Sequence, residues 1–209
     1  MSNKIMRIII ALIGIFMMGL GVAVNASALL GNDPVAILYD GIRNSLNLNA
    51  AQLGMVSNIV NYVIIALLLV IGRKYVNIGT VIYIIPFGSF VSIGTKLYGI
   101  VLDNPGLTER IIASSLACLT LYIGVGIFIA MEIGVDPFTG LVMVIKDKFH
   151  LDFKKTKVIF DICLVTIGSL LGGTLGVITI VTTLTAGPCI QFVAKMVSKK
   201  MNSNTKSTV

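Results

Sequence analysis

A short stretch ending in Asp-Pro occurs twice in this chain, and it constrains the fold more than any other feature. It reads Gly31-Asn32-Asp33-Pro34 near the N-terminus and Gly134-Val135-Asp136-Pro137 further on. The two copies are 103 residues apart (136 − 33), and their surroundings match at the same offset. The chain therefore contains an internal repeat of about half its length.

The match extends well beyond the two Asp-Pro pairs. It needs no gap from Gly21 to Ile59. A shift of four residues in the offset then brings the last helix of each half into alignment. The matched pairs include Gly21 with Gly124, Leu38 with Leu141, Ile42 with Ile145, Asn58 with Asp161, Thr80 with Thr179 and Gly88 with Gly187.

Composition places the chain in a membrane. Hydrophobic residues make up 56% of the 209 residues, charged residues only 12%, and the mean hydropathy is +0.98. Soluble domains contain about 25% charged residues.

The net charge of +7 does not indicate nucleic-acid binding, because the basic residues stand at the ends of apolar blocks and form no stripe. The three cysteines lie inside apolar blocks, which does not suggest a disulfide framework or a metal site.

The apolar blocks predict an all-α membrane protein with six transmembrane helices, because a span needs about 20 residues. We expect one membrane domain over residues 1–197, with repeat one at about 6–102, repeat two at about 111–197, and a polar, disordered cytoplasmic tail at 198–209. Lys4 and Arg7 before the first block also resemble a signal peptide, but cleavage after it would cut repeat one in half. The predicted spans are 8–30, 51–72, 78–102, 111–133, 157–175 and 177–197.

Each Asp-Pro pair predicts the start of a short amphipathic helix, over 34–46 and 137–149. Aspartate caps the free N–H groups of a first helical turn, and proline suits the position after it. These helices are too short to cross a bilayer. They either lie on its surface or re-enter it, and the sequence does not decide between the two.

Positive charge predicts the orientation of the chain. With six spans and a cytoplasmic N-terminus, thirteen basic residues lie in cytoplasmic segments and three lie outside. Both termini are then cytoplasmic, in a bacterial inner membrane. Each repeat holds three spans, an odd number, so repeat two enters the membrane inverted relative to repeat one. Inverted repeats with broken helices at corresponding places are typical of secondary transporters.

Several motifs resemble the YczE/YyaS/YitT family of bacterial membrane proteins. They are Gly-Leu-Gly-Val-Ala in the first span, Leu-Gly-x-Asp-Pro after it, Gly79-Thr80, and Ala186-Gly187-Pro188. The resemblance covers about residues 6–197 and is closer to the YczE branch, without the soluble C-terminal domain of YitT-like members. Repeat two departs from the pattern with Ile178-Thr179, and repeat one with Phe87-Gly88-Ser89. The resemblance implies a multi-span inner membrane protein but no substrate.

The repeat and the intramembrane polar residues give a set of candidate positions. Asp33 and Asp136 either only cap their helices or also line a solute pathway. Asp161 either pairs with Lys157 near the interface or faces a cavity at membrane depth. The candidate pathway is Asp33, Pro34, Asp136, Pro137, Asn58, Asp161, Thr80 and Thr179, and the candidate packing or hinge positions are Gly21, Gly88, Gly124, Gly187 and Pro188.

Two functions from different classes fit these patterns. The first is a secondary transporter or permease for a small polar or ionic solute. The second is a membrane binding protein, either a substrate-capturing subunit of another transporter or a scaffold for a partner enzyme. The expected partners are the lipid bilayer and an unknown solute, with a protein partner or a second copy left open, and no nucleic acid. No cofactor, metal site or enzyme activity is expected, because no catalytic motif is present.

Overall fold

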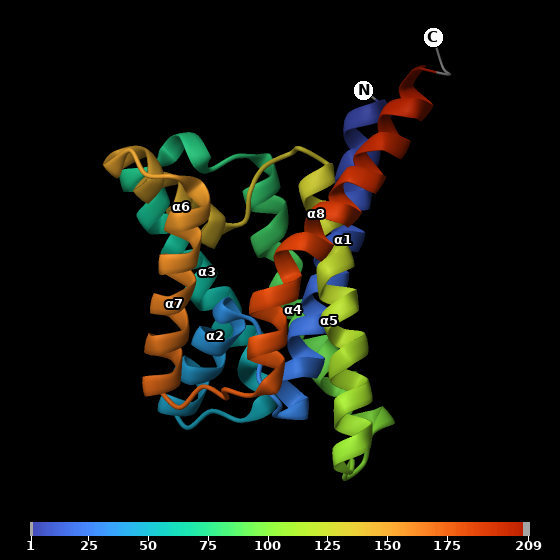
Figure 1. The fold of residues 1–209 in the computed structure, drawn as a ribbon, viewed down its shortest axis with the longest axis vertical. Helices are drawn as coiled ribbons and strands as arrows, with labels where there is room; N and C mark the ends of the chain where they lie inside the picture. The colour runs from blue at the N-terminus through green and yellow to red at the C-terminus, as the bar shows by residue number, and fades with distance from the viewer. Residues whose placement is uncertain (1, 207–209) are drawn as a thin grey trace.

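The chain folds as a set of helices running mostly along one common direction (Figure 1). The computed structural model describes residues 2–206, and the side chains of residues 4–201. No strand occurs in this part of the chain. The helices are α1 (Ser2–Ala28), α2 (Pro34–Ser45), η1 (Ala50–Gln52), α3 (Leu53–Ile71), η2 (Arg73–Tyr75), α4 (Ile78–Val101), α5 (Leu107–Ala130), α6 (Pro137–Phe149), α7 (Phe153–Leu170) and α8 (Val177–Lys206).

Five segments of the described chain are long and apolar enough to cross a membrane, which supports a multi-pass membrane protein. They are Lys4–Ala28, Ala50–Ile71, Ile78–Val101, Leu107–Ala130 and Val177–Met201. The sixth predicted span corresponds to α7, which has 18 residues, four of them charged. By composition it does not qualify, so a count of six spans stays a prediction.

The predicted disordered tail is wrong for most of its length. Helix α8 continues through Ser198 to Lys206, and residues 207–209 lie outside the described part. The sequence from Cys189 to Lys206 contains no glycine or proline, so nothing in it breaks the helix that began at Val177.

The helices form two connected groups. In the first, α1 packs against α5 and α4, and α5 packs against α8. In the second, the short helix α2 packs against α7 and α3, and the short helix α6 packs against α3 and α7. Contacts between α3 and α4 join the groups. Each short helix therefore packs against a long helix of the other half of the chain.

Small residues allow α1 and α5 to approach closely. A Cβ atom added at Gly21 would lie 2.8 Å from the carbonyl oxygen of Ala117, and one at Gly124 would lie 2.6 Å from that of Gly14. No larger residue fits at either position without moving the backbones apart. Close approach through small residues is a general way to pack helices in membranes.

The ends of α1 and α5 show that the two helices are antiparallel. Arg7, near the start of α1, donates to the carbonyl oxygen of Met131 after α5 (3.0 Å), and Arg110, near the start of α5, donates to that of Ala28 (2.6 Å). Arg7 and Arg110 are 103 residues apart, as are Ala28 and Met131. Positions that match in the sequence repeat therefore make the same contact in the structure.

The backbone repeats its unusual conformations as well. A positive φ is uncommon outside glycine, and three such pairs occur at the offset of 103 residues. They are Leu29 (56°) with Glu132 (52°), Gly31 (101°) with Gly134 (153°), and Asn47 (53°) with His150 (53°).

Candidate functional site

The two short helices are capped by the aspartates of the repeated Asp-Pro pairs. Oδ1 of Asp33 accepts from the backbone N–H groups of Val35 (3.1 Å) and Ala36 (3.3 Å). Oδ1 of Asp136 accepts from the N–H of Thr139 (3.0 Å), and its Oδ2 accepts from the Thr139 hydroxyl (2.6 Å). Capping is therefore part of the role of both residues, and Pro34 and Pro137 occupy the first position of each helix.

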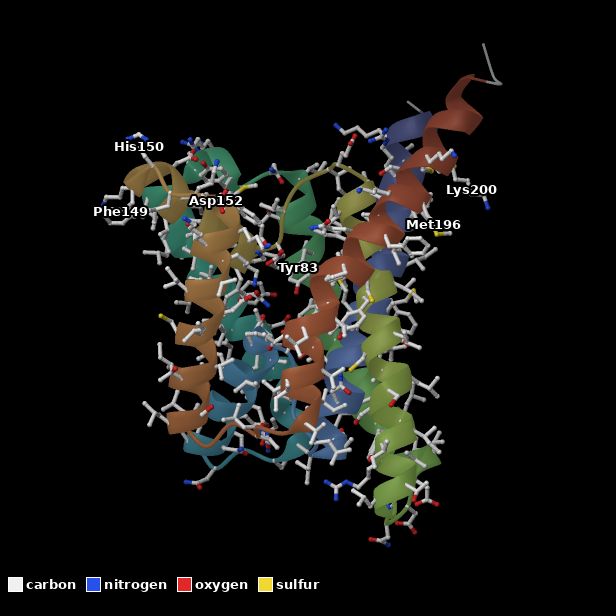
Figure 2. The ribbon with its side chains drawn as sticks, viewed as in Figure 1. Tyr83, Phe149, His150, Asp152, Met196 and Lys200 are labelled. Atoms are coloured by element: carbon white, nitrogen blue, oxygen red, sulfur yellow. The ribbon has the colours of Figure 1, made fainter. Side chains whose placement is uncertain are left out.

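Both short helices start inside the protein and run toward opposite ends of it (Figure 1). The end of α6, marked by Phe149 and His150, lies at the periphery in Figure 2. Ile37 of α2 and Val142 of α6 are fully buried. Neither helix has the one-sided burial expected of a helix lying on a membrane surface, because other helices surround both.

The loop before each short helix is held by the third helix of the other half. The N–H of Gly79 and the hydroxyl of Thr80, at the start of α4, donate to carbonyl oxygens of the loop before α6. At the start of α8, the N–H of Ile178 donates to the loop before α2, whose Asn32 N–H donates to the Thr179 hydroxyl. The four bonds are Gly79–Ile133 (2.9 Å), Thr80–Val135 (2.7 Å), Ile178–Leu30 (3.0 Å) and Asn32–Thr179 (3.3 Å). Thr80 and Thr179 thus fasten the two breaks.

Glycine is required at both breaks. Gly31 and Gly134 have φ values of 101° and 153°, which favour glycine. A Cβ atom at Gly134 would lie 1.7 Å from Oδ1 of Asn77, and one at Gly31 would lie 2.5 Å from Oγ1 of Thr179. The space before each short helix is filled by the other half of the chain.

Four charged groups gather near the starts of the short helices. Asp33 lies within electrostatic range of Lys157 and Asp161 on α7, and Asp161 lies within range of Asp136. Lys157 and Asp161 form an ion pair one helical turn apart, with side chains 34% and 26% exposed. The first interpretation of Asp161, a pair with Lys157, is confirmed, whereas its position facing a cavity at membrane depth stays a prediction.

Polar atoms without hydrogen-bond partners lie in the same place. Tyr39 and Asn61 are both 0% exposed. The Tyr39 hydroxyl interacts electrostatically with both caps and lies beside the Asn61 amide, but neither side chain completes a hydrogen bond of normal geometry. Oδ2 of Asp33 is also buried without a partner. In Asp136 the equivalent oxygen is bound by Thr139, whose matched position in repeat one is Ala36, which has no hydroxyl group.

Aromatic rings enclose this polar group on one side. The Tyr39 ring packs against Phe138 of α6 (centroids 5.8 Å apart) and Phe87 of α4 (6.4 Å). Tyr83 stacks on Phe87 at 4.7 Å. Figure 2 labels Tyr83 in the interior, between the two groups of helices. The rings come from α2, α4 and α6, so they join both halves of the chain around one place.

Asn58, the matched partner of Asp161, lies elsewhere in the structure. Its Oδ1 accepts from the backbone N–H of Gly88 (2.9 Å), which ties α3 to α4. Among the packing candidates, Gly88 is in close contact with α3, whereas a Cβ atom added at Gly187 would have nothing within 4 Å. Gly187 therefore differs from the packing expectation. Pro188 lies inside α8, which changes direction along its length (Figure 1).

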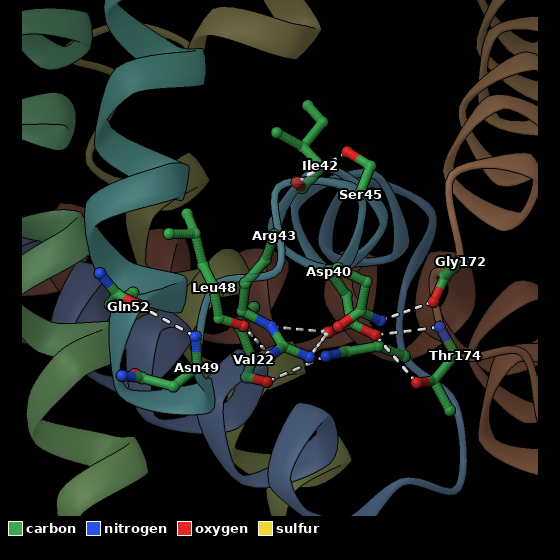
Figure 3. A network of polar contacts seen from close by, with 12 residues as sticks. Val22, Asp40, Ile42, Arg43, Ser45, Leu48, Asn49, Gln52, Gly172 and Thr174 are labelled. Carbon is green, nitrogen blue, oxygen red and sulfur yellow. Dashed lines mark hydrogen bonds and ion pairs between the residues drawn. The ribbon is translucent and has the colours of Figure 1, made fainter.

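A buried ion pair anchors the C-terminal end of α2, as Figure 3 shows. Asp40 is 3% exposed and pairs with Arg43 at 2.7 Å. Its second oxygen accepts from the N–H and the hydroxyl of Thr174, each at 2.9 Å. The amide of Asn44 donates to the carbonyl oxygen of Gly172 at 2.6 Å. These bonds join α2 to the loop between α7 and α8.

An exposed group fastens α6 at the other end. Asp147 accepts from Lys74 (2.6 Å) and from the hydroxyl of Tyr75, both in η2 between α3 and α4. The hydrogen bond from Lys74 holds the pKa of Asp147 well below its ordinary value of 3.8, and the Tyr75 bond acts in the same direction. The same bond from Lys74 raises the pKa of Lys74 above 10.5. Asp147 matches Asn44 in the repeat, so corresponding residues fasten both short helices.

Sequence patterns missed part of this site. The pattern of the amphipathic helix 34–46 places Asp40 away from its apolar face, but the side chain is buried. Tyr39 gave no signal, because a tyrosine in an apolar stretch is usually packing. Asn61, an amide within the apolar helix α3, lies beside Tyr39 of α2 without completing a hydrogen bond of normal geometry.

The fold and these contacts define a helical multi-pass membrane protein in which two short helices both pack against α3 and α7. The profile of a family of unknown function, DUF6198, matches residues 5–195, and the chain belongs to that family. An uncharacterized protein of Haemophilus influenzae is 24% identical over 190 residues, covering 91% of this chain and 84% of that protein. No solved structure matches the chain. The relation to the YczE/YyaS/YitT family stays a prediction.

Proposed function

We propose that this protein is a secondary transporter or permease that moves a small polar or ionic solute across the bacterial inner membrane. The observation that carries the proposal is the meeting of two broken helices in the interior, each capped by an aspartate and fastened by the opposite half of the chain. In transporters with inverted repeats, broken helices at corresponding places form the solute site near the middle of the membrane.

The antiparallel arrangement of α1 and α5 supports two inverted three-helix repeats. Corresponding residues make corresponding contacts at opposite ends of these helices, as Arg7 and Arg110 do. Inversion also requires α7 to cross the membrane. Its central charges do not argue against this, because Lys157 and Asp161 pair with each other and lie near the caps of the short helices. Intramembrane charges usually face the protein interior.

The fastened ends of α2 and α6 are suited to act as gates. One end is closed by Asp40, Arg43 and Thr174, and the other by Asp147, Lys74 and Tyr75. Each set joins a short helix to a loop of the opposite half. Opening one set while the other stays closed would expose the central group to one side at a time.

The first experiment tests the inversion with a matched pair of cysteines. Leu46 and Phe149 end the two short helices, are 103 residues apart, and are 61% and 63% exposed. In a background with Cys118, Cys163 and Cys189 replaced by serine, Leu46→Cys and Phe149→Cys are treated with an impermeant maleimide in whole cells and in inverted vesicles. We expect labelling from opposite faces. Labelling of both from one face would remove the main support for a transporter.

The second experiment separates transport from a binding or scaffold function. The purified protein is reconstituted alone in liposomes, and uptake is measured from a panel of labelled small polar solutes and ions. We expect flux that Asp161→Asn abolishes and that the exposed control Asp103→Asn leaves unchanged. Activity that requires a second, co-purified protein would favour a substrate-capturing subunit or a scaffold.

A further inference from the structure

Three buried oxygen atoms near the starts of the short helices make no hydrogen bond to the protein. They are Oδ2 of Asp33, the hydroxyl of Tyr39 and Oδ1 of Asn61, from α2 and α3 and from the break between α1 and α2. Burying a polar atom without a partner costs about 1–3 kcal/mol. Tyr39 lies beside Asn61 and within electrostatic range of Asp33, so these side chains leave acceptor capacity that a ligand can use.

The local charge favours a cation. When ionised, Asp33, Asp136 and Asp161 carry three negative charges, and Lys157 within electrostatic range of Asp33 and Asp161 carries one positive charge. The starts of α2 and α6 add about +0.5 each from the helix dipole. The sum is about −1, which a single monovalent cation would neutralise.

The geometry of the partners also favours a cation. Carboxylate, hydroxyl and amide oxygens are the ligands of hard cations and the acceptors for ammonium groups. The rings of Tyr39, Tyr83 and Phe87 beside them present apolar and π-electron surface, which attracts an ammonium group further. An anion would meet the donors of Tyr39 and Asn61, but it would also face three carboxyl groups, and the charge of Lys157 is already paired with Asp161.

We propose that Asp33, Tyr39 and Asn61 form a binding site for one small monovalent cation between the starts of α2 and α6. The inference deepens the proposed function, because such an ion is either the transported solute or the ion that drives transport. The chemistry is shared by two sources, an alkali-metal ion and a primary ammonium group. The three residues come from the first half of the chain, and Phe138 at the start of α6 packs against the ring of Tyr39.

Binding to the purified protein in detergent tests the proposal without any need for transport. Thermal melting and calorimetry are carried out with sodium chloride, with methylammonium chloride, and with tetramethylammonium chloride at the same ionic strength as a control. Tetramethylammonium has the same charge but no N–H donor and a larger radius. We expect sodium or methylammonium to raise the melting temperature in a saturable manner, whereas tetramethylammonium does not. Saturation by sodium identifies an alkali-metal site, and saturation by methylammonium identifies an amine site.

Variants then assign the site. Tyr39→Phe removes one hydroxyl and should weaken binding about tenfold, as expected for a hydrogen bond to a charge. Tyr62→Phe, on the exposed side of α3, is the matched control. Asp33→Asn keeps a good helix cap but removes the charge, so binding should be lost while melting without ligand is unchanged.

Two results would overturn the site. One is the absence of any saturable shift with either cation, and the other is an unchanged dissociation constant in both Tyr39→Phe and Asp33→Asn. The outcome is independent of flux in liposomes. Cation binding without flux would keep the site and reject the transporter, and flux without cation binding would do the reverse.

Discussion

The helix pairs α3–α4 and α7–α8 occupy matched positions in the two halves but are built differently. In the first half, a Cβ atom at Gly54 would lie 2.1 Å from the carbonyl oxygen of Gly88, and Asn58 bonds to Gly88 across the same contact. In the second half the matched residues are Lys157, Gly187 and Asp161. Lys157 and Asp161 bond to each other, and a Cβ atom added at Gly187 would meet nothing within 4 Å.

This difference shows that the duplication preserved the backbone and changed the packing. Caps, positive-φ positions and loop contacts recur in both halves, whereas the bond between the second and third helices exists only in the first. Loss of that bond leaves Asp161 to face the caps of the short helices. We expect α3 and α4 to move as one body and α8 to move separately from α7.

The largest expected effect concerns the two ends of the short helices. Asp40→Ala should destabilise the protein by about 3–5 kcal/mol, because it leaves the largely buried Arg43 without its partner. Asp147→Ala, at the exposed end, should cost far less. Melting in detergent checks both. Equal losses of stability in Asp40→Ala and Asp147→Ala would mean that burial does not make the α2 contact stronger than the α6 contact.

The next effect concerns the helix pairs themselves. Gly88→Ala should cost about 1–3 kcal/mol, because the new methyl group would meet the backbone of Gly54. Gly187→Ala should change stability by less than about 0.5 kcal/mol, because it meets nothing. The difference in melting temperature between the two variants measures the asymmetry directly. A destabilised Gly187→Ala protein would show that Gly187 packs against a neighbouring helix after all.

A smaller effect separates Asn58 from Asp161. Asn58→Ala should lose about 1 kcal/mol, because Gly88 loses its bond to the side chain. Asp161→Asn should leave stability nearly unchanged but abolish flux in liposomes. Melting and flux are measured on the same preparations. If both variants lose stability and keep activity, Asp161 has only a structural role.

The two capping aspartates should differ slightly in how much they stabilise their helices. Asp136→Ala and Asp33→Ala should each lose about 1 kcal/mol of helix capping. Asp136→Ala should lose somewhat more, because both oxygens of Asp136 are bound by Thr139 and only one oxygen of Asp33 is bound within its helix. Loss of flux in Asp33→Ala at unchanged melting would show that capping is not its whole role.

The smallest effect is a pH dependence at the exposed end. The pKa of Asp147 is lowered in the folded protein, so its contribution to stability is present above about pH 4, the range of an unfolded carboxyl group, and is lost as the pH falls through the folded-state value. Lys74→Met should therefore narrow the difference in stability between neutral and strongly acid pH, with no effect of pH between about 5 and 8. Acid melting curves of the two proteins check this, and identical acid sensitivity would contradict it.

The sequence was sufficient for much of this fold because the repeat could be compared with itself. Asp-Pro predicted both caps and both short helices, and the matched threonines proved to hold the two breaks. The position of Tyr39 and Asn61 could not be predicted, because it depends on how α2, α3 and α6 meet, which no local pattern encodes. The polar composition after Ser198 predicts disorder, but polar residues without glycine or proline also continue a helix, as α8 does. The separation of α7 from α8 is invisible in sequence, since glycine suits both close packing and open space.

The crossed fastening of the two breaks has a consequence for synthesis of the chain. Thr80 bonds to a residue 55 positions later, and Asn32 bonds to one 147 positions later. When the first half has just left the ribosome, its break has no partner, and polar backbone groups that lie within the bilayer cannot be satisfied by lipid. We therefore expect the first half to remain partly folded until α8 has been synthesised. An insertase or chaperone that binds this intermediate would raise the yield of folded protein.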